Sequence, residues 1–292
     1  MNDPVLQWCG VTRAFGGSVA VAGVSLDVSP GEVVGLVGEA GAGKSVLLQI
    51  AAGWLTQDSG EVVVCGQAAG TIAARRLVGY APAAPAFPPG LAVGALLEYY
   101  ARFHGPRRAG RALVAQALEF AELGTVAAER PPRLPQSTLR RVSLAQAVLG
   151  GRRILLLDQT LDGVDPLARR SLAGKLGRLA WNGTAVVLAS HDLATVERLA
   201  DRIVVLRAGV IVRAAPAAVL LGERVLEIVL DAPPAAPPPG FRLAPFGIEA
   251  DLGPRTVEAA LAQCRAHRLV VRATRVRSQS LEDVVVESEG GS

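Results

Sequence analysis

The sequence is poor in several features that mark particular classes of protein. Its 292 residues include only three cysteines, Cys9, Cys65 and Cys264, whose spacing fits neither a metal site nor an obvious disulfide. This excludes a disulfide scaffold and suits a reducing compartment. Half of the chain is hydrophobic, yet no apolar run reaches the roughly 18 to 20 residues of a membrane-spanning helix. The first residues lack the pattern of a signal peptide, so we expect a cytoplasmic protein.

Lysine is nearly absent, although the chain is basic. Lysine and arginine together number 30, and only Lys44 and Lys175 are lysines. The net charge of +4 and the pI near 9.3 come mainly from arginines that are dispersed, often as isolated pairs such as Arg75-Arg76. Binding to nucleic acid requires a clustered basic patch. We therefore predict no nucleic-acid partner.

The strongest motif is Gly-Glu-Ala-Gly-Ala-Gly-Lys-Ser at residues 38–45. It fits the phosphate-binding pattern G-x-x-x-x-G-K-[ST] at every fixed position. The preceding run, Glu32–Val37, is typical of a buried strand, and Val46–Ala52 is typical of a helix that ends near Gly53. A strand, a loop and a helix in this order are the context in which the motif holds phosphate. We therefore predict a nucleotide-binding loop.

Each residue type in this loop has a physical role. Glycines let successive backbone N–H groups converge on phosphate oxygens at a helix N-terminus. The Lys44 ammonium would reach the β- and γ-phosphates, and the Ser45 hydroxyl would bind Mg²⁺. The predicted cofactors are therefore ATP and Mg²⁺. The predicted contacts in this loop are Gly38, Gly41, Ala42, Gly43, Lys44, Ser45 and Val46.

Two further segments narrow the class. Arg153–Asp158 is an apolar strand that ends in a carboxylate, as a Mg²⁺-binding aspartate beside a phosphate loop requires. Thr184–Ala189 is a second apolar strand, and it runs into Ser190, His191 and Asp192. The sequence has no Asn-Lys-x-Asp motif, which argues against a GTPase. It also has no long heptad insertion, which argues against chromosome-organising relatives of such a fold.

These motifs together resemble the ATP-binding subunits of ABC transporters over essentially the whole chain. In that family, Gly38–Ser45 is the Walker A motif and Leu155–Asp158 is the Walker B motif, with Asp158 as the magnesium ligand. The resemblance implies that Phe15 stacks on the adenine ring, although it is also suited to a core position near a turn. It implies that Asp165 acts across a dimer interface. It also implies that His191 is the switch histidine at the γ-phosphate.

Two departures from the family pattern concern hydrolysis. The catalytic glutamate that follows the Walker B aspartate is replaced by Gln159. Glutamine can hydrogen-bond the attacking water, but it has no charge with which to take its proton, and the loss of such a base typically lowers the rate by about 10²- to 10⁴-fold. The family's glutamine that senses Mg²⁺ and the γ-phosphate corresponds to Ala83. A methyl group coordinates nothing, so we predict weak hydrolysis.

The signature segment, Leu-Ser-Gly-Gly-Gln in the family, is also altered. It corresponds to Leu134–Thr138, with Pro135 at the serine position and Gln136 and Ser137 in place of the glycines. Proline has neither a hydroxyl nor an N–H group. We expect this segment to remain a helix start, with Ser137 as the cap of a helix over Thr138–Leu149, and to be a poor phosphate contact.

The predicted fold class is α/β, with a P-loop ABC-type ATPase core that includes an antiparallel β subdomain and an α-helical subdomain. The core is expected over residues 1–222 and the helical subdomain over about 91–150. Alternating apolar and turn patterns predict the individual elements. They are strands at Gly60–Cys65 and Leu77–Tyr80, and crossover helices at Leu167–Leu179 and Leu193–Ala200.

Residues 223–292 are predicted to form a small accessory α+β domain. It begins with the strand Val225–Leu230, followed by a proline-rich linker over residues 231–240. A helix at Thr256–Ala266 and a strand at Leu269–Thr274 are expected next. The closing Ser280–Val286 resembles the Ser-Leu-Glu-Asp-Val-Phe ending of ATPases of the ABC-2 exporter group, which handle drugs, lipids, polysaccharides or sodium.

The resemblance implies an ATP-binding subunit that drives or regulates export. Its partners would be a polytopic transmembrane permease and a second ATP-binding subunit. That subunit would be an identical copy or, as the altered motifs favour, a different chain. The protein would then lie in the cytoplasm, on the inner face of the membrane. A soluble ABC ATPase outside transport, or a regulatory ATP-binding protein, is the alternative. A P-loop kinase is disfavoured by the order of Asp158, Asp165 and His191.

Overall fold

The computed structural model describes residues 3–104, 107–220, 225–231, 234, 236–244, 247–251, 257–267, 269–277 and 281. The chain folds as two compact units, Met1–Ala215 and Pro216–Ser292. The predicted end of the core at Gly222 lies outside the described residues, as does Ser280–Val286 apart from Leu281. Within the described ranges, no helix is both long enough and apolar enough to cross a membrane.

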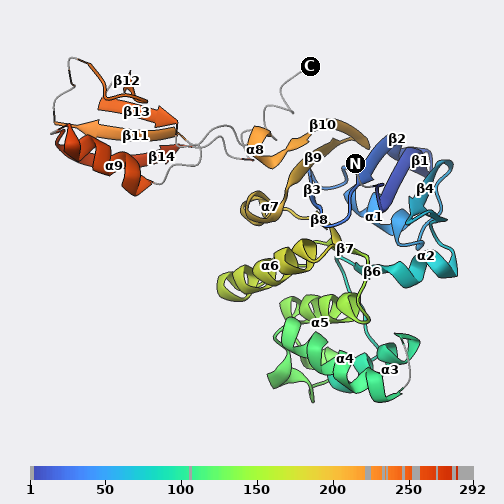
Figure 1. Cartoon of the computed structure of the whole chain (residues 1–292). Helices are drawn as coiled ribbons and strands as arrows, with labels where there is room; N and C mark the ends of the chain where they lie inside the picture. Colours follow the sequence, from blue (N-terminus) through green and yellow to red (C-terminus); the bar gives the residue numbers. More distant parts are fainter. Residues whose placement is uncertain are drawn as a thin grey trace. The chain divides into compact units, whose positions relative to one another are not determined.

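The first unit begins with an antiparallel sheet of four strands in the order β2-β1-β4-β5 (Figure 1). β1 and β2 form a long hairpin that turns at Gly16 and Gly17, both of which have positive φ. The inner face of this sheet packs Leu6, Trp8 and Val11 against the helix that follows β3. The strands are β1 (Leu6–Phe15), β2 (Ser18–Val28), β4 (Ser59–Val64) and β5 (Gln67–Ala68).

The second sheet has six strands in the order β10-β9-β3-β8-β7-β6. Its central strands β3, β8 and β7 are parallel and buried at every position, because helices cover both faces of such a sheet. The strands are β3 (Val33–Val37), β6 (Val78–Ala81), β7 (Ile154–Asp158), β8 (Ala185–Ala189), β9 (Arg202–Arg207) and β10 (Val210–Pro216). The helices are α1 (Lys44–Ala51), α2 (Ile72–Leu77), α6 (Pro166–Trp181), α7 (Leu193–Leu199) and α8 (Ala217–Leu220), of which α8 belongs to the second unit.

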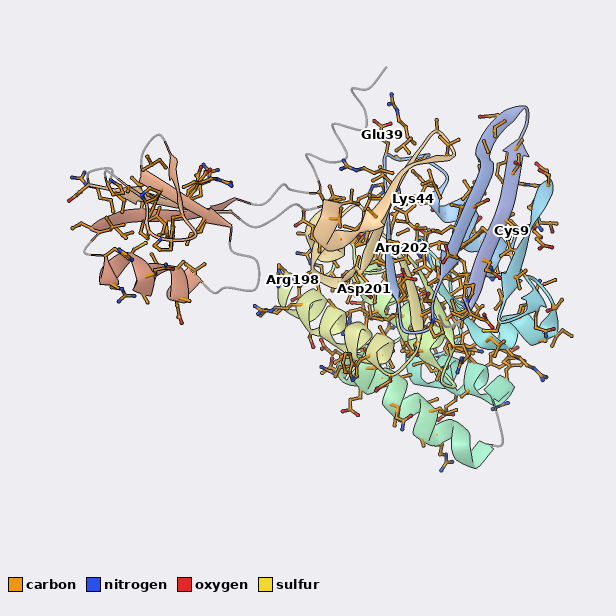
Figure 2. All side chains as sticks on the ribbon, turned by 45° about the horizontal axis from the view of Figure 1, so that its top comes forward. Cys9, Glu39, Lys44, Arg198, Asp201 and Arg202 are labelled. Carbon is orange, nitrogen blue, oxygen red and sulfur yellow. The ribbon has the colours of Figure 1, made fainter. Side chains whose placement is uncertain are left out.

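Charged side chains fix the amino end of β3, the strand that leads into the phosphate loop. The Asp201 carboxylate accepts a hydrogen bond from the Val33 N–H at 2.9 Å. The Arg202 guanidinium pairs with Glu32 at 2.7 Å, and both side chains are largely buried. Figure 2 shows Asp201 and Arg202 side by side at the start of β9. Residues far apart in the sequence therefore set the position of the strand before the loop.

Three helices form the subdomain expected over about 91–150, and Figure 1 shows them together in green. They are α3 (Val93–Ala101), α4 (Arg107–Phe120) and α5 (Gln136–Val148), with short 3₁₀ turns η1 (Arg102–His104), η2 (Gly124–Val126) and η3 (Pro131–Arg133). Their buried faces form a separate hydrophobic cluster. The predicted cap at Ser137 is wrong, because α5 begins at Gln136 with Pro135 as its N-cap residue. The fixed φ of proline suits the start of a helix, so α5 forms without a side-chain cap.

The second unit has an antiparallel sheet in the order β12-β13-β11-β14 and one helix, α9 (Val257–Ala266). Leu226, Ile228 and Ile248 on the sheet pack against Ala260 and Cys264 of the helix in a small core of their own. The α+β fold expected for the tail is therefore present. Its strands are β11 (Val225–Leu230), β12 (Arg242–Ala244), β13 (Gly247–Asp251) and β14 (Val271–Arg277).

The contact between β6 and α5 leaves no room for a side chain at Gly79. A methyl group there would lie 2.0 Å from the carbonyl oxygen of Ala147. We expect Gly79→Ala to lower the free energy of unfolding by about 1 to 3 kcal/mol, as for other overpacked sites. The urea midpoint measures this effect. Gly124→Ala is the matched control, because no atom of the described residues lies within 4 Å of the added methyl group. Equal midpoints for the two variants would contradict the proposed crowding.

Candidate functional site

The loop between β3 and α1 has a backbone that glycine makes possible. Gly38, Gly41 and Gly43 have φ values of 140°, 81° and 101°. A methyl group at Gly38 would lie 2.1 Å from the carbonyl oxygen of Leu206, and one at Gly43 would lie 2.4 Å from that of Ala20. Helix α1 begins directly after the loop, with no side-chain cap and no acidic residue in its first turn. Its free N–H groups and its dipole therefore favour an anion at this point.

Lys44 lies inside this loop and not on the surface. Only 5% of the residue is exposed, and its ammonium donates hydrogen bonds to the carbonyl oxygens of Gly38 at 2.6 Å and Glu39 at 2.8 Å. Burial lowers the pKa of Lys44, whereas the charges of Asp158 and Asp162 raise it. Figure 2 shows Lys44 directed into the protein and Glu39 directed away from it. The ammonium is thus held on the loop by neutral carbonyl oxygens. Negatively charged oxygens, such as those of a phosphate, would be stronger acceptors and can replace them.

Asp158 ends β7 at the same edge of the sheet. It is almost fully buried, and its Oδ1 atom has no hydrogen-bond partner among the described residues. Burial raises the pKa of this carboxyl, while a hydrogen bond from Ser45 and the Lys44 charge lower it. An unpaired buried carboxylate oxygen beside a serine hydroxyl is the donor set that Mg²⁺ prefers. The residues present therefore fit the predicted metal.

His191 follows β8, which lies between β3 and β7 in the sheet. Its Nε2 atom lies 3.3 Å from Nε2 of Gln159. Gln159 has a positive φ of 49°, and its backbone N–H donates to the carbonyl oxygen of Ala189 at 2.8 Å. The parallel register pairs Asp158 with Ala189, so the residues after the two strands come together. The geometry thus brings Lys44, Ser45, Asp158, Gln159 and His191 to one edge of the sheet.

Other predicted site residues lie in different surroundings. Phe15 is 43% exposed at the end of β1, and the Arg13 guanidinium lies 4.7 Å from the centre of its ring. Asp165 caps α6, and its carboxylate accepts hydrogen bonds from the N–H groups of Leu167 and Ala168. Ala83 follows β6 in a half-buried loop. Their predicted roles toward a nucleotide and a second subunit stay predictions.

Asp162 has a place at the site that the sequence did not reveal. Its carboxylate accepts hydrogen bonds from the Ser190 hydroxyl and from the His191 backbone N–H, the latter at 3.1 Å. Its charge also acts on Lys44 and Asp158. The sequence around Asp162 gives no signal of this role, because Ser190 lies 28 residues away and only the fold brings the two side chains together.

The fold and the loop define the class of protein. A glycine-rich loop that joins the central strand of a parallel sheet to an uncapped helix is the anion site of P-loop proteins. Comparison with known protein families narrows this class further. Residues 21–162 match the model of a family described as "ABC transporter".

Two relatives illustrate the similarity. The Nod factor export ATP-binding protein I of Burkholderia orbicola (strain AU 1054) is 34% identical over 233 residues, which are 78% of this chain and 77% of that protein. The protein of the same name from Burkholderia thailandensis (strain E264) is 32% identical over 261 residues, 88% of this chain and 86% of that one. This chain therefore belongs to the ABC transporter family, as an ATP-binding subunit.

Solved structures agree with this fold. A dimeric bacterial ABC transporter cassette superposes with a TM-score of 0.68 at 24% identity, covering 73% of this chain and 98% of that one. A post-hydrolysis dimer of an ATP-binding cassette bound to ADP and Pi gives a TM-score of 0.67 at the same identity. The predicted fold class is therefore confirmed.

The buried Asp158 carboxyl leads to a prediction on stability. Because its pKa is raised in the folded chain, the native state binds more protons than the unfolded state above the ordinary pKa of 3.8. Stability from this group is then lost as the pH rises through the folded pKa. We expect Asp158→Asn to raise the Tm of the nucleotide-free chain, with a gain that grows with pH and then levels off. Thermal unfolding across pH measures it. A variant that is less stable than the wild type at neutral pH would contradict the prediction.

Proposed function

We propose that this chain is the ATP-binding subunit of an ABC-2-type exporter, and that it binds Mg-ATP to drive or regulate export. One observation carries the proposal: the Lys44 ammonium is held by two loop carbonyls at the uncapped start of α1, beside a buried carboxylate with one oxygen that no described residue pairs. Unpaired buried polar groups are unfavourable unless a ligand satisfies them. The names of the relatives, which are export ATP-binding proteins, support the same assignment.

The residues of the loop then have separate tasks. Lys44 exchanges its carbonyl partners for phosphate oxygens, a change from neutral to charge-assisted hydrogen bonds. The α1 N–H groups hold the phosphates in place. Ser45 and Asp158 would hold Mg²⁺, which when bound neutralises charge on the phosphates. Phe15, which is half-exposed, offers a ring face for the adenine base.

Binding is tested at the two lysines of the chain. We expect Lys44→Ala to weaken the affinity for a fluorescent ATP analogue by about 100-fold or more, since it removes a charged phosphate contact. Lys175→Ala is the matched control, because it removes the other lysine of the same unit, a partly buried side chain of α6 that pairs with Glu122. The Kd of the control should equal that of the wild type. Equal Kd values for the Lys44 and Lys175 variants would refute the proposed site.

We infer that the isolated chain hydrolyses ATP slowly. Gln159 lies where the family has a catalytic base, and its amide faces His191. An amide has no basic lone pair with which to take a proton from water. Ala83 offers no ligand, and Pro135, the N-cap residue of α5, lacks the hydroxyl of the signature serine. In a dimer of identical chains, these changes would meet at each nucleotide.

The rate of ATP turnover tests this inference. We expect the isolated chain to release phosphate far more slowly than the roughly 1 to 10³ s⁻¹ of ordinary enzymes. Gln159→Glu restores little by itself, because Ala83 and Pro135 are unchanged. Steady-state phosphate release is the assay, with Lys44→Ala as the blank. A wild-type rate in the ordinary range would contradict weak hydrolysis. A large gain from Gln159→Glu alone would show instead that the base is the one missing part.

A groove of about 420 Å³ supports a protein partner for the first unit. It lies among α2, β6, α3 and α5, and it is lined by aromatic and arginine side chains that include Trp54, Tyr80, Phe103 and Arg75. Trp54 and Phe103 are 63% and 67% exposed. Large exposed aromatics are typical of interfaces. We propose that a transmembrane permease docks here and that a second ATP-binding subunit, identical or different, completes the nucleotide sites.

Membrane association separates this proposal from a soluble or regulatory ATP-binding protein outside transport. Purification of the full chain from its native source identifies the bound subunits. A polytopic membrane protein supports the exporter assignment. A second ATPase with an intact signature and a Walker B glutamate would identify the expected unequal pair. We propose that the second unit, which has a separate core, holds the two ATP-binding subunits together.

A further inference from the structure

Asp162 joins two loops that the sheet places side by side. Its two carboxylate oxygens each accept a different hydrogen bond, Oδ1 from the Ser190 hydroxyl and Oδ2 from the His191 backbone N–H. Ser190 is buried, and its hydroxyl oxygen also accepts a hydrogen bond from the Asp192 N–H at 2.9 Å. The segment that carries His191 is therefore fixed on the loop after β7 by one side chain.

The backbone of Asp162 is held in turn from two directions. Its N–H donates to the carbonyl oxygen of Gln159 at 3.2 Å, which closes the turn between these residues. Its carbonyl oxygen accepts a hydrogen bond from the Arg140 guanidinium of α5. Arg140 also lies against Gly163, since a methyl group there would be 3.4 Å from its guanidinium. Arg140 thus connects the helical subdomain to this turn.

The orientation of the His191 ring depends on the same turn. The amide nitrogen of Gln159 faces Nε2 of His191 at 3.3 Å, and an amide nitrogen donates but does not accept. Nε2 of His191 must then be the acceptor, which leaves the ring proton on Nδ1. In this arrangement Nε2 cannot donate a hydrogen bond to a phosphate oxygen.

We propose that Asp162 is a positioning residue that keeps His191 next to Gln159, in the tautomer in which Nε2 is an acceptor. Because Arg140 of α5 bonds to the backbone of Asp162, this positioning then depends on where α5 lies. A shift of α5 that moves Arg140 would loosen the turn and free the ring to donate. The inference rests on the proposed nucleotide site for its purpose, but the contacts that carry it are between residues of this chain. It adds to the proposed function a route by which the helical subdomain acts on the switch histidine.

Two substitutions separate hydrogen bonding from charge. In Asp162→Asn the amide oxygen accepts from the His191 N–H and the amide nitrogen donates to the Ser190 oxygen, so both connections persist without the charge. In Asp162→Ala both connections are lost. The proposal therefore predicts that asparagine preserves the state of the ring and that alanine does not.

The test is nitrogen NMR of the nucleotide-free full chain with ¹⁵N-labelled histidine. The chain has three histidines, so a His191→Gln sample assigns the resonances. At a pH where the ring is neutral, we expect the wild type and Asp162→Asn to show one tautomer, with the proton on Nδ1. Asp162→Ala is expected to lose this preference and show the mixed tautomers of a free imidazole. Arg140→Met should shift the ratio in the same direction.

Glu122 is the matched control, because its bonding copies that of Asp162 away from the site. Its carboxylate accepts a hydrogen bond from the Ser171 hydroxyl at 2.6 Å, and its carbonyl oxygen accepts one from Arg141 of α5. Glu122→Ala should leave the His191 resonances unchanged. If Asp162→Ala does not fold, Ser190→Ala removes one of the two connections and should give an intermediate ratio.

Three outcomes would overturn the proposal. They are a single unchanged tautomer in Asp162→Ala or Ser190→Ala, an equal change in Asp162→Asn and Asp162→Ala, and an equal change in Glu122→Ala. The measurement uses no nucleotide, so its result is independent of the ATP affinity measured for Lys44→Ala. Failure of ATP binding with the expected tautomers would refute the proposed function and leave the positioning role of Asp162 in place.

Discussion

The parallel pairing of β3, β8 and β7 is the constraint on which the site depends. Each strand is buried along its whole length, and the backbone hydrogen bonds of a parallel sheet fix which residues lie next to one another. Because the strands run in the same direction, their carboxyl ends meet at one edge. This pairing therefore brings Lys44, Asp158 and His191, which are far apart in the sequence, to the same edge of the sheet.

Sequence patterns predicted much of this architecture. The strands β3, β7 and β8 were expected within one residue of their observed bounds. A short apolar run that ends at a glycine-rich loop or a carboxylate strongly favours a buried strand. The helices α6 and α7 were expected within two residues. The bounds of α5 were also expected within two residues, but its predicted cap was wrong, because a serine pattern suggested the cap and Pro135 occupies that position.

Tertiary contacts explain what the sequence could not predict. The Asp162 carboxylate finds Ser190 and His191 across 28 and 29 residues, and Arg202 finds Glu32 across 170. Local propensity contains no information about such partners. The sequence also gave Phe15 two possible surroundings, and neither included the Arg13 guanidinium that covers its ring. Side-chain roles that depend on one sequence motif could thus be predicted, whereas roles that depend on contacts between two loops could not.

The backbone at Gln159 has a consequence for substitution at this position. Its left-handed φ and its N–H bond to Ala189 belong to the main chain and the sheet register, and the side chain takes no part in them. Exchange between a carboxylate and an amide at this position therefore leaves the scaffold unchanged. A glutamine or a glutamate can therefore occupy this position with the same main-chain hydrogen bond. The exchange of an amide for a carboxylate here thus changes the chemistry of the site and not the packing, whereas any side chain at Gly38 or Gly43 would clash with a backbone carbonyl.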